Sequence, residues 1–437
     1  MNPARIHMIG IGGIGMSGLA QLLRDRSDIV TGSDREASPV TQMLEEKGIK
    51  VIIGHSPDNL APNLDLVVYS DAAHPDNIER MEAVRLGIPE LSYFQMLGQV
   101  SQSRRTVAVS GTNGKTTTTG MLAKILADNG ASPTAIIGSI VRDFESNYLS
   151  GSPDLFVVEA CEYRDHVLEL SPEILVITNI EWDHTDYFAS LADVQNTFHK
   201  AIQKVPEAGF IITDTEHPAI QPLLEDVRAT VIDYTKEPGY ALRLPGEFNR
   251  MNARAASAAA RVILPTLTDT AIATALGGFH GTWRRFEYKG KTEAGNDVLD
   301  DYAHHPTAIS ETLRALRARL EESGDPFRII VLFHPHLYSR TRDLLDSFAR
   351  AFTDADEIII LPIYAAREED DGTVSSELLA SRIQEEGGSA RAVDSFEDAE
   401  AMVRGLARPG DTIITMGAGD VYKIADALVA DFPALQP

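Results

Sequence analysis

The chain has 437 residues, enough for about three domains at roughly 150 residues each. Its 64 acidic and 39 basic side chains give a formal net charge of −25. This balance argues against nucleic acid or an anionic membrane as the main partner, because both are bound through clustered Lys and Arg. The 43% content of hydrophobic residues is typical of a globular protein with sizeable cores and excludes a largely disordered chain.

The single cysteine, Cys161, excludes an intrachain disulfide and a thiolate metal site. The glycine-rich N-terminal segment lacks the small-residue cleavage site of a signal peptide. No apolar run approaches the ~20 residues that span a bilayer. We therefore expect a soluble cytoplasmic protein, either a monomer or a weak homodimer, with no nucleic-acid or membrane partner.

In the first hundred residues, short apolar runs alternate with helical patterns, which indicates a parallel sheet with crossover helices. The polar stretch 99–105 is interpreted as a linker. The expected strands are 5–9, 28–34, 51–53 and 66–69, and the expected helices are 16–24 and 39–47.

The same alternation starts twice more along the chain. The second start gives a strand, a glycine turn and a helix at 106–110, 111–119 and 120–129, followed by strands at 154–160, 173–180 and 209–214 and a helix at 249–262. The third gives a strand, loop and helix within 297–320, then strands within 328–336, 357–364 and 411–419. We expect an α/β protein of three domains: a Rossmann-like domain (1–100), a central P-loop ATPase-like domain (101–290) and a C-terminal Rossmann-like domain (291–437).

The first motif is GIGGIG (10–15), which lies between a strand and a helix and matches G-x-G-x-x-G. Its glycines allow a tight turn and the close approach of a diphosphate to the helix N-terminus. Asp34 follows 24 residues after Gly10, where an acidic residue can hold a ribose hydroxyl. The motif predicts nucleotide binding but leaves open which nucleotide, and glycines that serve only strand–helix packing are the alternative.

The second motif is GTNGKT (111–116), again between a strand and a helix. Consecutive N–H groups would hold phosphates, Lys115 would reach the β- and γ-phosphate oxygens, and Thr116 would coordinate Mg²⁺. The full P-loop pattern requires a glycine at the position of Val109, so this loop is a shortened one. We interpret it as an ATP site rather than a chance glycine turn.

Acidic residues and a histidine follow two apolar strands of the same domain, in EACE (159–162) and NIEWDH (179–184). The carboxyl ends of parallel strands are where α/β sheets bind ligands, and carboxylate oxygens suit Mg²⁺. A solvated loop charge is the alternative for each acidic residue. Cys161 is interpreted as a buried bystander, because no base is dedicated to it.

Two histidine-containing segments, DYAHHP (301–306) and HPHLYSR (334–340), lie in the last third of the chain. Zinc binding is an alternative, but the acidic third ligand and the spacing of known zinc patterns are absent. We favour recognition of a substrate or of ATP.

Taken together, the two glycine loops, NIEWDH, FNRMNA (248–253), RRFE (284–287) and DYAHHP resemble the Mur ligase family, whose members build the peptide stem of peptidoglycan with ATP. The resemblance covers the whole chain. It implies an ATP-dependent ligase that joins L-alanine to UDP-N-acetylmuramate through an acyl phosphate, with Mg²⁺ as cofactor.

The resemblance also implies roles for individual residues. The catalytic residues would be Lys115, Arg285 and His304, and the metal ligands would be Thr116, Glu159 and His184. UDP-N-acetylmuramate and the amino acid would contact Gly12, Gly13, Ile14, Gly15, Met16, Asp34, Ser70, His336 and Arg340. ATP would contact Gly111, Thr112, Asn113, Gly114, Lys115, Thr116, Thr117, Asn249, Arg285 and Asp301.

At three positions the sequence departs from the pattern that the family suggests. Asn113 replaces a histidine of the phosphate loop, Phe248 replaces the histidine before Asn249, and Leu337 replaces a basic residue. No lysine near 200–204 is assigned as a carbamylated metal bridge. The alternatives are a murein-recycling ligase that adds a tripeptide to the same sugar nucleotide, a nicotinamide-dependent dehydrogenase that uses only the first loop, and a binding protein that retains an inactive ligase fold.

Overall fold

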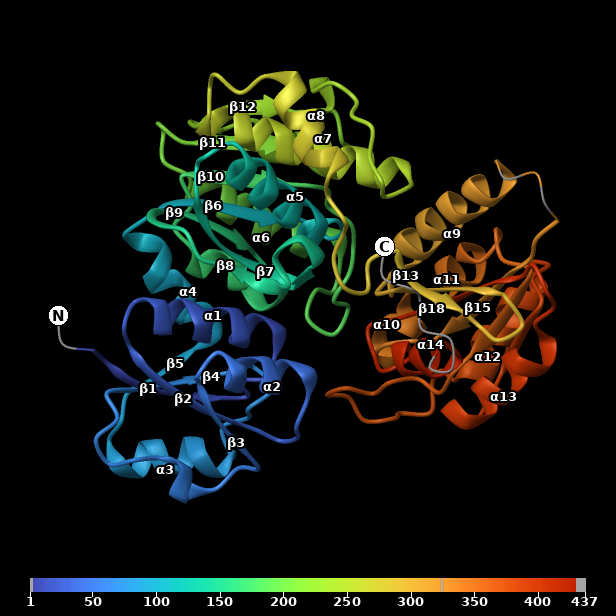
Figure 1. Ribbon diagram of the computed structural model, residues 1–437, viewed down its shortest axis with the longest axis horizontal. Helices are drawn as coiled ribbons and strands as arrows, with labels where there is room; N and C mark the ends of the chain where they lie inside the picture. Colours follow the sequence, from blue (N-terminus) through green and yellow to red (C-terminus); the bar gives the residue numbers. More distant parts are fainter. Residues whose placement is uncertain (1–2, 323, 325, 430–437) are drawn as a thin grey trace. The chain divides into compact units, whose positions relative to one another are not determined.

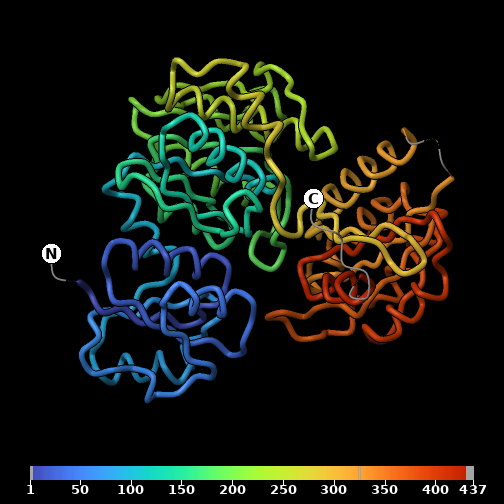
Figure 2. Tube along the Cα trace, in the orientation of Figure 1, coloured from blue at the N-terminus to red at the C-terminus, as the bar shows by residue number. Residues whose placement is uncertain are grey.

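The computed structural model describes residues 3–322, 324 and 326–429, and its trace passes through three α/β regions in turn (Figures 1 and 2). The N-terminal sheet is parallel, in the order β3-β2-β1-β4-β5. Its strands are β1 (Arg5–Ile9), β2 (Ile29–Asp34), β3 (Lys50–Ile53), β4 (Leu66–Tyr69) and β5 (Glu90–Ser92), and its helices are α1 (Ile14–Asp25), α2 (Pro39–Glu46), α3 (Ile78–Leu86) and α4 (Tyr93–Gln102).

The middle sheet has the order β12-β11-β10-β6-β9-β7-β8 and is parallel except for the antiparallel pair β7–β8. Its strands are β6 (Arg105–Ser110), β7 (Pro133–Val141), β8 (Ser146–Leu149), β9 (Ser152–Glu159), β10 (Ile174–Ile177), β11 (Phe210–Thr213) and β12 (Thr230–Asp233). The helices of this part of the chain are α5 (Lys115–Asp128), α6 (Leu191–Gln203), α7 (Glu247–Ile263) and α8 (Asp269–Gly277).

The C-terminal sheet has the order β13-β14-β18-β15-β16-β17, with only β13 antiparallel to its neighbour among the described strands. Its strands are β13 (Glu287–Lys291), β14 (Asp297–Asp301), β15 (Ile329–Phe333), β16 (Glu357–Ile360), β17 (Ala390–Ala392) and β18 (Thr412–Met416). Its helices are α9 (Pro306–Glu321), α10 (Tyr338–Asp343), α11 (Leu345–Ala351), α12 (Ser376–Glu385), α13 (Phe396–Leu406) and α14 (Tyr422–Val429).

The contacts divide the chain into two compact units. The first unit holds the N-terminal and middle sheets and consists of the residues up to Ile180 with Val194–Ala241 and Met251–His280. The second unit holds the C-terminal sheet and consists of Glu181–Asp193, Leu242–Arg250 and the residues from Gly281 onward. The three sheets agree with the predicted fold class, and the boundaries near 100 and 290 stay predictions. Among the described residues, no helix combines the length and apolar character needed to cross a membrane.

Two predicted segments were wrong in extent. The stretch 99–105 is not a linker, because α4 continues to Gln102 with Val100 buried, after a capping box at Ser92 has started the helix. The turn predicted at 111–119 ends at Gly114, and α5 begins at Lys115 rather than at residue 120. The run of threonines that follows Lys115 has low helix propensity, but these side chains are buried, so tertiary packing decides the conformation.

Within the first unit, the helix that follows the glycine loop packs on the edge of the middle sheet. The Asn147 side chain of β8 donates to the Ile14 carbonyl and lies 3.1 Å from Ser17 Oγ, and Gln21 Nε2 donates to Asn147 Oδ1 at 3.3 Å. Gly18 permits this approach, since a Cβ there would lie 3.1 Å from both Asn147 and Ile136. A buried polar seam therefore joins α1 to β8.

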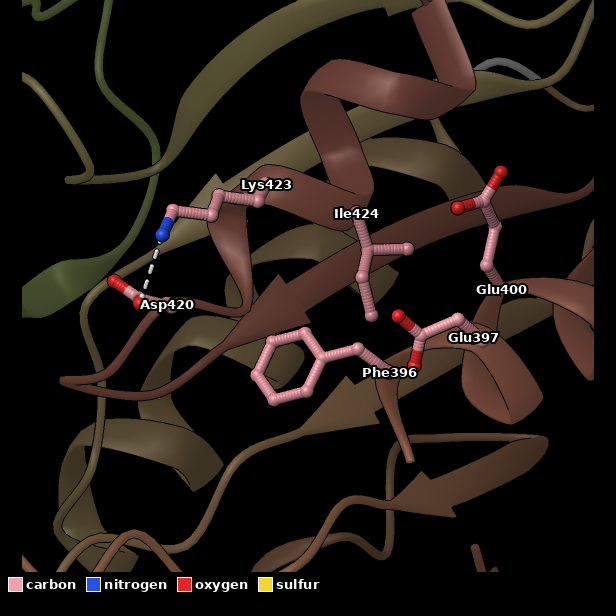
Figure 3. Close-up of a pocket in the computed structure, with 6 residues that line it drawn as sticks. All are labelled: Phe396, Glu397, Glu400, Asp420, Lys423 and Ile424. Carbon is pink, nitrogen blue, oxygen red and sulfur yellow. Dashed lines mark hydrogen bonds and ion pairs between the residues drawn. The ribbon is translucent and has the colours of Figure 1, made fainter. Parts of the chain in front are cut away.

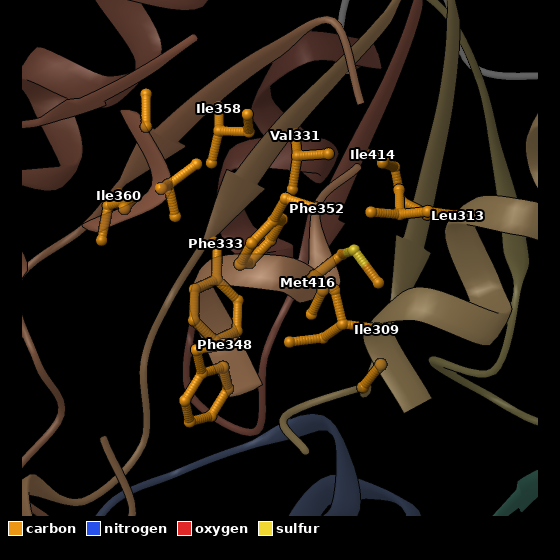
Figure 4. Packing of buried hydrophobic residues seen from close by; sticks show 14 of the residues in the cluster. Ile309, Leu313, Val331, Phe333, Phe348, Phe352, Ile358, Ile360, Ile414 and Met416 are labelled. Atoms are coloured by element: carbon orange, nitrogen blue, oxygen red, sulfur yellow. The ribbon is translucent and has the colours of Figure 1, made fainter. Parts of the chain in front are cut away.

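The largest described core of the second unit lies between the C-terminal sheet and helices α9, α11 and α12. Phe333 of β15 is fully buried, with its ring centroid 5.2 Å from that of Phe352 and 5.7 Å from that of Phe348 (Figure 4). Strand β15 is buried at every position, as expected for a parallel strand covered on both faces.

Replacing Phe333 with Ala should lower the free energy of unfolding of this unit by about 3–5 kcal/mol, because it removes buried apolar area and leaves a cavity. Hydrogen exchange of the amides of β15 and β18 measures this local stability. Leu378→Ala on α12, where the side chain is 40% exposed, is the control and should change the stability by less than about 1 kcal/mol. Equal effects of the two substitutions would contradict this account of the core.

Candidate active site

The first glycine loop is a tight turn that is hydrogen-bonded to the end of β2. Gly10, with φ of 78°, and Ile11 both donate their backbone N–H to the Ser33 carbonyl, at 2.9 and 3.0 Å. The N–H of Gly12 donates to Asp34 Oδ2 at 2.8 Å, and a Cβ on Gly12 would lie 2.8 Å from the same oxygen. The structure thus brings the loop and Asp34 together, as predicted, but one carboxylate oxygen of Asp34 already holds the loop.

The remaining predicted residues of this site surround the same turn. A Cβ on Gly10 would lie 2.9 Å from Ser70 Cβ, and one on Gly15 would lie 2.7 Å from the Tyr93 ring. Ile14 and Met16 lie in the first turn of α1, directly after Gly13 at its N-cap. The N-terminus of a helix and the exposed backbone of the turn together suit an anionic diphosphate.

The second glycine loop joins β6 to α5 and requires two left-handed glycines, Gly111 with φ of 128° and Gly114 with φ of 84°. Close packing excludes side chains at both positions. A Cβ on Gly111 would lie 2.1 Å from Thr178 Oγ1, and one on Gly114 would lie 2.2 Å from Asn252 Oδ1. These contacts are within the first unit, and they place Asn252 of the FNRMNA segment against the loop.

The side-chain amide of Asn179 bonds both the N–H and the carbonyl of Asn113 at the centre of this loop, as the backbone of a neighbouring strand would. Its Oδ1 accepts from the Asn113 N–H at 2.9 Å, and its Nδ2 donates to the Asn113 carbonyl at 3.0 Å. Thr178 Oγ1 donates to the same carbonyl at 2.6 Å, and the Thr112 N–H donates to the Asn179 carbonyl at 3.0 Å. The sequence pattern singled out the segment that contains Asn179, but not this role.

Lys115, the first residue of α5, folds back over the loop. Its Nζ donates to the Gly111 and Thr112 carbonyls at 2.5 and 3.1 Å and lies 3.0 Å from Glu162 Oε2. Burial lowers the pKa of Lys115, but the Glu162 carboxylate outweighs it, so the pKa lies above its usual value and the amine is charged. Glu162, which is almost fully buried, lies in the EACE segment that the sequence pattern singled out, but its pairing with Lys115 was not predicted.

Thr116 and Glu159 present oxygen atoms next to this loop. Thr116 Oγ1 donates to Glu159 Oε1 at 3.0 Å, and the Gly138 N–H donates to Glu159 Oε2 at 2.7 Å. The described residues contain no group of three or more His, Cys, Asp or Glu side chains arranged to hold a metal. The pair still fits Mg²⁺, which uses hard oxygen ligands and takes most of its shell from phosphates and water. The predicted ligand His184 belongs to the second unit, and its role stays a prediction.

In the second unit, Arg340 is almost fully buried and pairs with Asp183. Arg340 Nε donates to Asp183 Oδ1 at 2.7 Å, and Arg340 Nη1 lies 3.2 Å from His336 Nδ1. Burial raises the pKa of Asp183, but the charge of Arg340 lowers it well below its usual value. Asp183 therefore carries a negative charge and holds Arg340 beside His336.

His304 and His336, which lie near Arg340, are uncharged at neutral pH. Burial, together with the charge of Arg340, lowers the pKa of His336 to about 3 and that of His304 well below its usual value. His304 Nδ1 lies 2.9 Å from the Tyr302 carbonyl, so this nitrogen carries the proton and Nε2 is left as an acceptor. The ring centroids of His304 and His336 are 6.2 Å apart, which brings these two predicted residues together.

Asp301 and Arg285 are neighbours at the end of β14. Asp301 accepts backbone N–H bonds from Phe286 at 2.6 Å and Ala303 at 2.7 Å. Burial raises the pKa of Asp301 to about 6, although Arg285 opposes the shift. Arg284, which the sequence reasoning did not select, is buried between Asp300 at 2.8 Å and the carbonyls of Gly417 and Gly419.

Asn249 occupies the first turn of α7 and is buried, and its Nδ2 donates to the Pro245 carbonyl at 2.7 Å. Its contact with adenine stays a prediction. Elsewhere in the second unit, a cavity of about 410 Å³ is lined by Asp420 and Lys423, which pair at 2.9 Å, and by four further residues (Figure 3). This cavity contains none of the predicted site residues.

Comparisons with known proteins agree over most of the chain. Three family models match in order: "Mur ligase family, catalytic domain" over residues 5–105, "Mur ligase middle domain" over 109–241, and "Mur ligase, glutamate ligase domain" over 284–419. The UDP-N-acetylmuramate–L-alanine ligase of Acetivibrio thermocellus is 40% identical, over 98% of this chain and 96% of that protein.

Two solved structures have the same fold at full length. The UDP-N-acetylmuramate–alanine ligase of Thermotoga maritima superposes with a TM-score of 0.80 at 26% identity, covering 98% of this chain and 99% of that one. A murein peptide ligase of Psychrobacter arcticus has a TM-score of 0.74 at 27% identity, covering 99% and 100%.

The buried pair of Asp183 and Arg340 gives a stability prediction. Asp183→Asn should destabilise the second unit by about 3–5 kcal/mol, because it leaves the Arg340 charge buried without its partner. Thermal and urea unfolding of the full chain measure this. A carboxyl group with a lowered folded-state pKa contributes stability above its unfolded pKa, so the difference from wild type should shrink as the pH falls below about 4.

Asp186→Asn is the matched control. Asp186 lies in the same segment and pairs with Arg367 at 2.6 Å, in a bridge whose arginine is one-third exposed. We expect this substitution to cost less than about 1 kcal/mol. A D183N protein as stable as D186N would show that the buried bridge does not hold this unit together.

Proposed function

The chain belongs to the Mur ligase family, and on that premise we propose that it joins L-alanine to the lactyl carboxylate of UDP-N-acetylmuramate in peptidoglycan precursor synthesis, using ATP. The observation that carries this proposal is the second glycine loop, on which a charged Lys115 and the Thr116–Glu159 pair converge. A dehydrogenase would leave this loop without a role. An inactive relative would be expected to lack Lys115 or Glu159.

The first glycine loop, with Asp34 and Ser70, is proposed to bind the UDP of the sugar nucleotide. The second loop, 111–117, is proposed to bind the ATP phosphates, with Asn249, Arg285 and Asp301 as further nucleotide contacts. Mg²⁺ held by Thr116 and Glu159, with His184 as the predicted third ligand, would supply charge neutralisation at the transferred phosphoryl group. The described oxygens of Thr116 and Glu159 support this assignment.

A carboxylate does not acylate an amine directly, because oxide would have to leave. In the proposed reaction, an oxygen of the lactyl carboxylate attacks the γ-phosphorus of ATP, and ADP leaves. The L-alanine amine then attacks the acyl carbon, the C–O bond to phosphate breaks, and inorganic phosphate is released. Lys115 and Arg285 would stabilise the negative charge that develops in both steps.

On the amino-acid side, the proposal assigns His304, His336 and Arg340. The uncharged His304 has a free acceptor at Nε2, which suits an N–H of the attacking amine. Arg340 is proposed to hold the amino-acid carboxylate through the guanidinium edge that Asp183 does not occupy.

Phosphate release from ATP and UDP-N-acetylmuramate tests the function, with single amino acids and the tripeptide supplied in parallel. We expect release with L-alanine, with serine and glycine as the comparison substrates. Release with the tripeptide alone would identify a murein-recycling ligase instead. No release with any acceptor would overturn the proposal.

Lys115→Ala should reduce ADP release by at least about 10²–10³-fold, because it removes a charge that stabilises the transferred phosphoryl group. Binding of UDP-N-acetylmuramate, measured by calorimetry, should be retained. Lys124→Ala, on the same helix but paired with Asp128 at 3.0 Å, is the control and should leave turnover unchanged. Full activity of K115A would refute the assignment of the phosphate loop.

A further inference from the structure

Arg285 lies between two residues whose backbone is in the left-handed conformation. Arg284 has φ of 60° and Phe286 has φ of 50°. Neither is a glycine, and this conformation is costly for any residue that has a Cβ. It persists only where the surrounding contacts outweigh its cost. The backbone that carries Arg285 therefore depends on the contacts that hold its two neighbours.

Both neighbours are hydrogen-bonded through their backbone. The Phe286 N–H donates to Asp301 Oδ2 at 2.6 Å, and the Phe286 ring is buried in the core of the second unit. The Arg284 N–H donates to Glu287 Oε2 at 2.9 Å, and the Arg284 carbonyl accepts from the Tyr302 N–H at 2.7 Å. These bonds attach the turn 284–286 to the end of β14.

The side chain of Arg284 adds the strongest attachment. It is 4% exposed, and each nitrogen of its guanidinium has an acceptor in the protein. Nε donates to Asp300 Oδ2 at 2.8 Å, and Nη1 and Nη2 donate to the carbonyls of Gly419 and Gly417 at 2.8 and 2.7 Å. Asp300 lies in β14 and the two glycines follow β18, which is the parallel neighbour of β14. Only the planar fork of an arginine can reach acceptors on both strands at once.

Arg285 itself is half-buried and is presented differently. Its Cζ lies 4.9 Å from the centroid of the Tyr302 ring, and Arg284 Cζ lies 5.2 Å from the same centroid. The two arginines are thus adjacent in sequence and share one aromatic ring. Arg284 is fixed to the sheet, whereas Arg285 projects from the turn that Arg284 holds.

We infer that Arg284 is a positioning residue, which holds the left-handed turn 284–286 and thereby keeps Arg285 in the conformation that the phosphoryl transfer requires. This inference rests on the proposed role of Arg285 in stabilising the charge of the reacting phosphate. Arg284 does not itself contact a substrate, because its guanidinium is engaged with Asp300 and the two glycine carbonyls.

The double substitution Arg284→Met with Asp300→Asn tests this role. It removes the ion pair without leaving an unpaired buried charge. ADP release by the full-length protein, with UDP-N-acetylmuramate and L-alanine present and ATP varied, gives kcat and KM. We expect kcat to fall about 10- to 100-fold, because a displacement of about 1 Å in a catalytic group has an effect of that order. KM for ATP should stay within about threefold of wild type, since an interaction made only in the transition state changes kcat.

Arg285→Ala provides the decisive comparison. Alone, it should lower kcat at least as much as R284M/D300N does. When the three substitutions are combined, kcat should fall by less than about threefold below that of R285A, because a positioning residue has no effect once the group that it positions is gone.

Arg328→Met with Asp411→Asn is the matched control. This ion pair, at 2.6 Å, lies at the opposite end of the same sheet, where Arg328 precedes β15 and Asp411 precedes β18. Its kcat should stay within about twofold of wild type. If thermal unfolding shows that R284M/D300N does not fold, Arg284→Lys takes its place. It keeps a charge beside Asp300 but lacks the fork, and kcat should fall about 3- to 10-fold with the same lack of additivity.

Independent, multiplicative losses in the combined variant would overturn the inference and leave the proposed function intact. So would an unchanged kcat in R284M/D300N, or equal losses in that variant and in R328M/D411N, which would show a merely structural role. Full activity of R285A would overturn both the inference and the role assigned to Arg285. Absence of ADP release by the wild-type protein would overturn the proposed function, and the inference with it.

Discussion

The anion binding that we propose for this acidic chain depends on two fixed turns and on the N-termini of the helices that follow them. Each turn follows a parallel strand and leads into a helix, and each needs left-handed glycines, Gly10 in the first and Gly111 and Gly114 in the second. Hydrogen bonds to neighbouring side chains keep the turns in place. Asp34 accepts from the Gly12 N–H, and the Asn179 side chain bonds both the N–H and the carbonyl of Asn113. A net charge of −25 is compatible with anionic substrates because these dipoles act locally.

Three of the cations described above, one in the first unit and two in the second, are already matched by carboxylates. Lys115 contacts Glu162, Arg284 contacts Asp300, and Arg340 contacts Asp183. In each pair at least one partner is buried, so the charges are ordered before any substrate arrives. Because these side chains are already ordered, less conformational entropy is lost when a substrate binds. Because each cation has a carboxylate partner, its positive charge is compensated. The buried histidines around Arg340 add no charge at neutral pH, because burial keeps them unprotonated.

Much of the fold followed from local patterns. Apolar runs such as 174–177 and 329–333 are buried at every position, so they could be identified as parallel strands covered on both faces. The start of α5 could not be identified, because a run of threonines disfavours a helix until packing is known. The antiparallel strands β8 and β13 were also missed, since short edge strands with polar residues give a weak signal.

In the candidate site, too, some features could be predicted from the sequence and others could not. The glycine loops could be predicted because turns with a positive φ angle favour glycine. Glu162 and Asn179 act on loop residues 47 and 66 positions away, so their roles depend on tertiary pairing that spacing does not reveal. The roles of Arg285, Asp301 and Asn249 came from the family resemblance rather than from spacing.

The polar seam between α1 and β8 has a consequence for how this protein can be divided. Asn147 contacts the Ile14 carbonyl and Ser17, in the helical turn that directly follows the first glycine loop, and Gln21 continues the seam. Cutting the chain near residue 100 would expose these polar groups and the bare surface at Gly18 to water. The first hundred residues are therefore not a self-contained unit, and an excised N-terminal fragment would lack the support for the helix that follows its glycine loop.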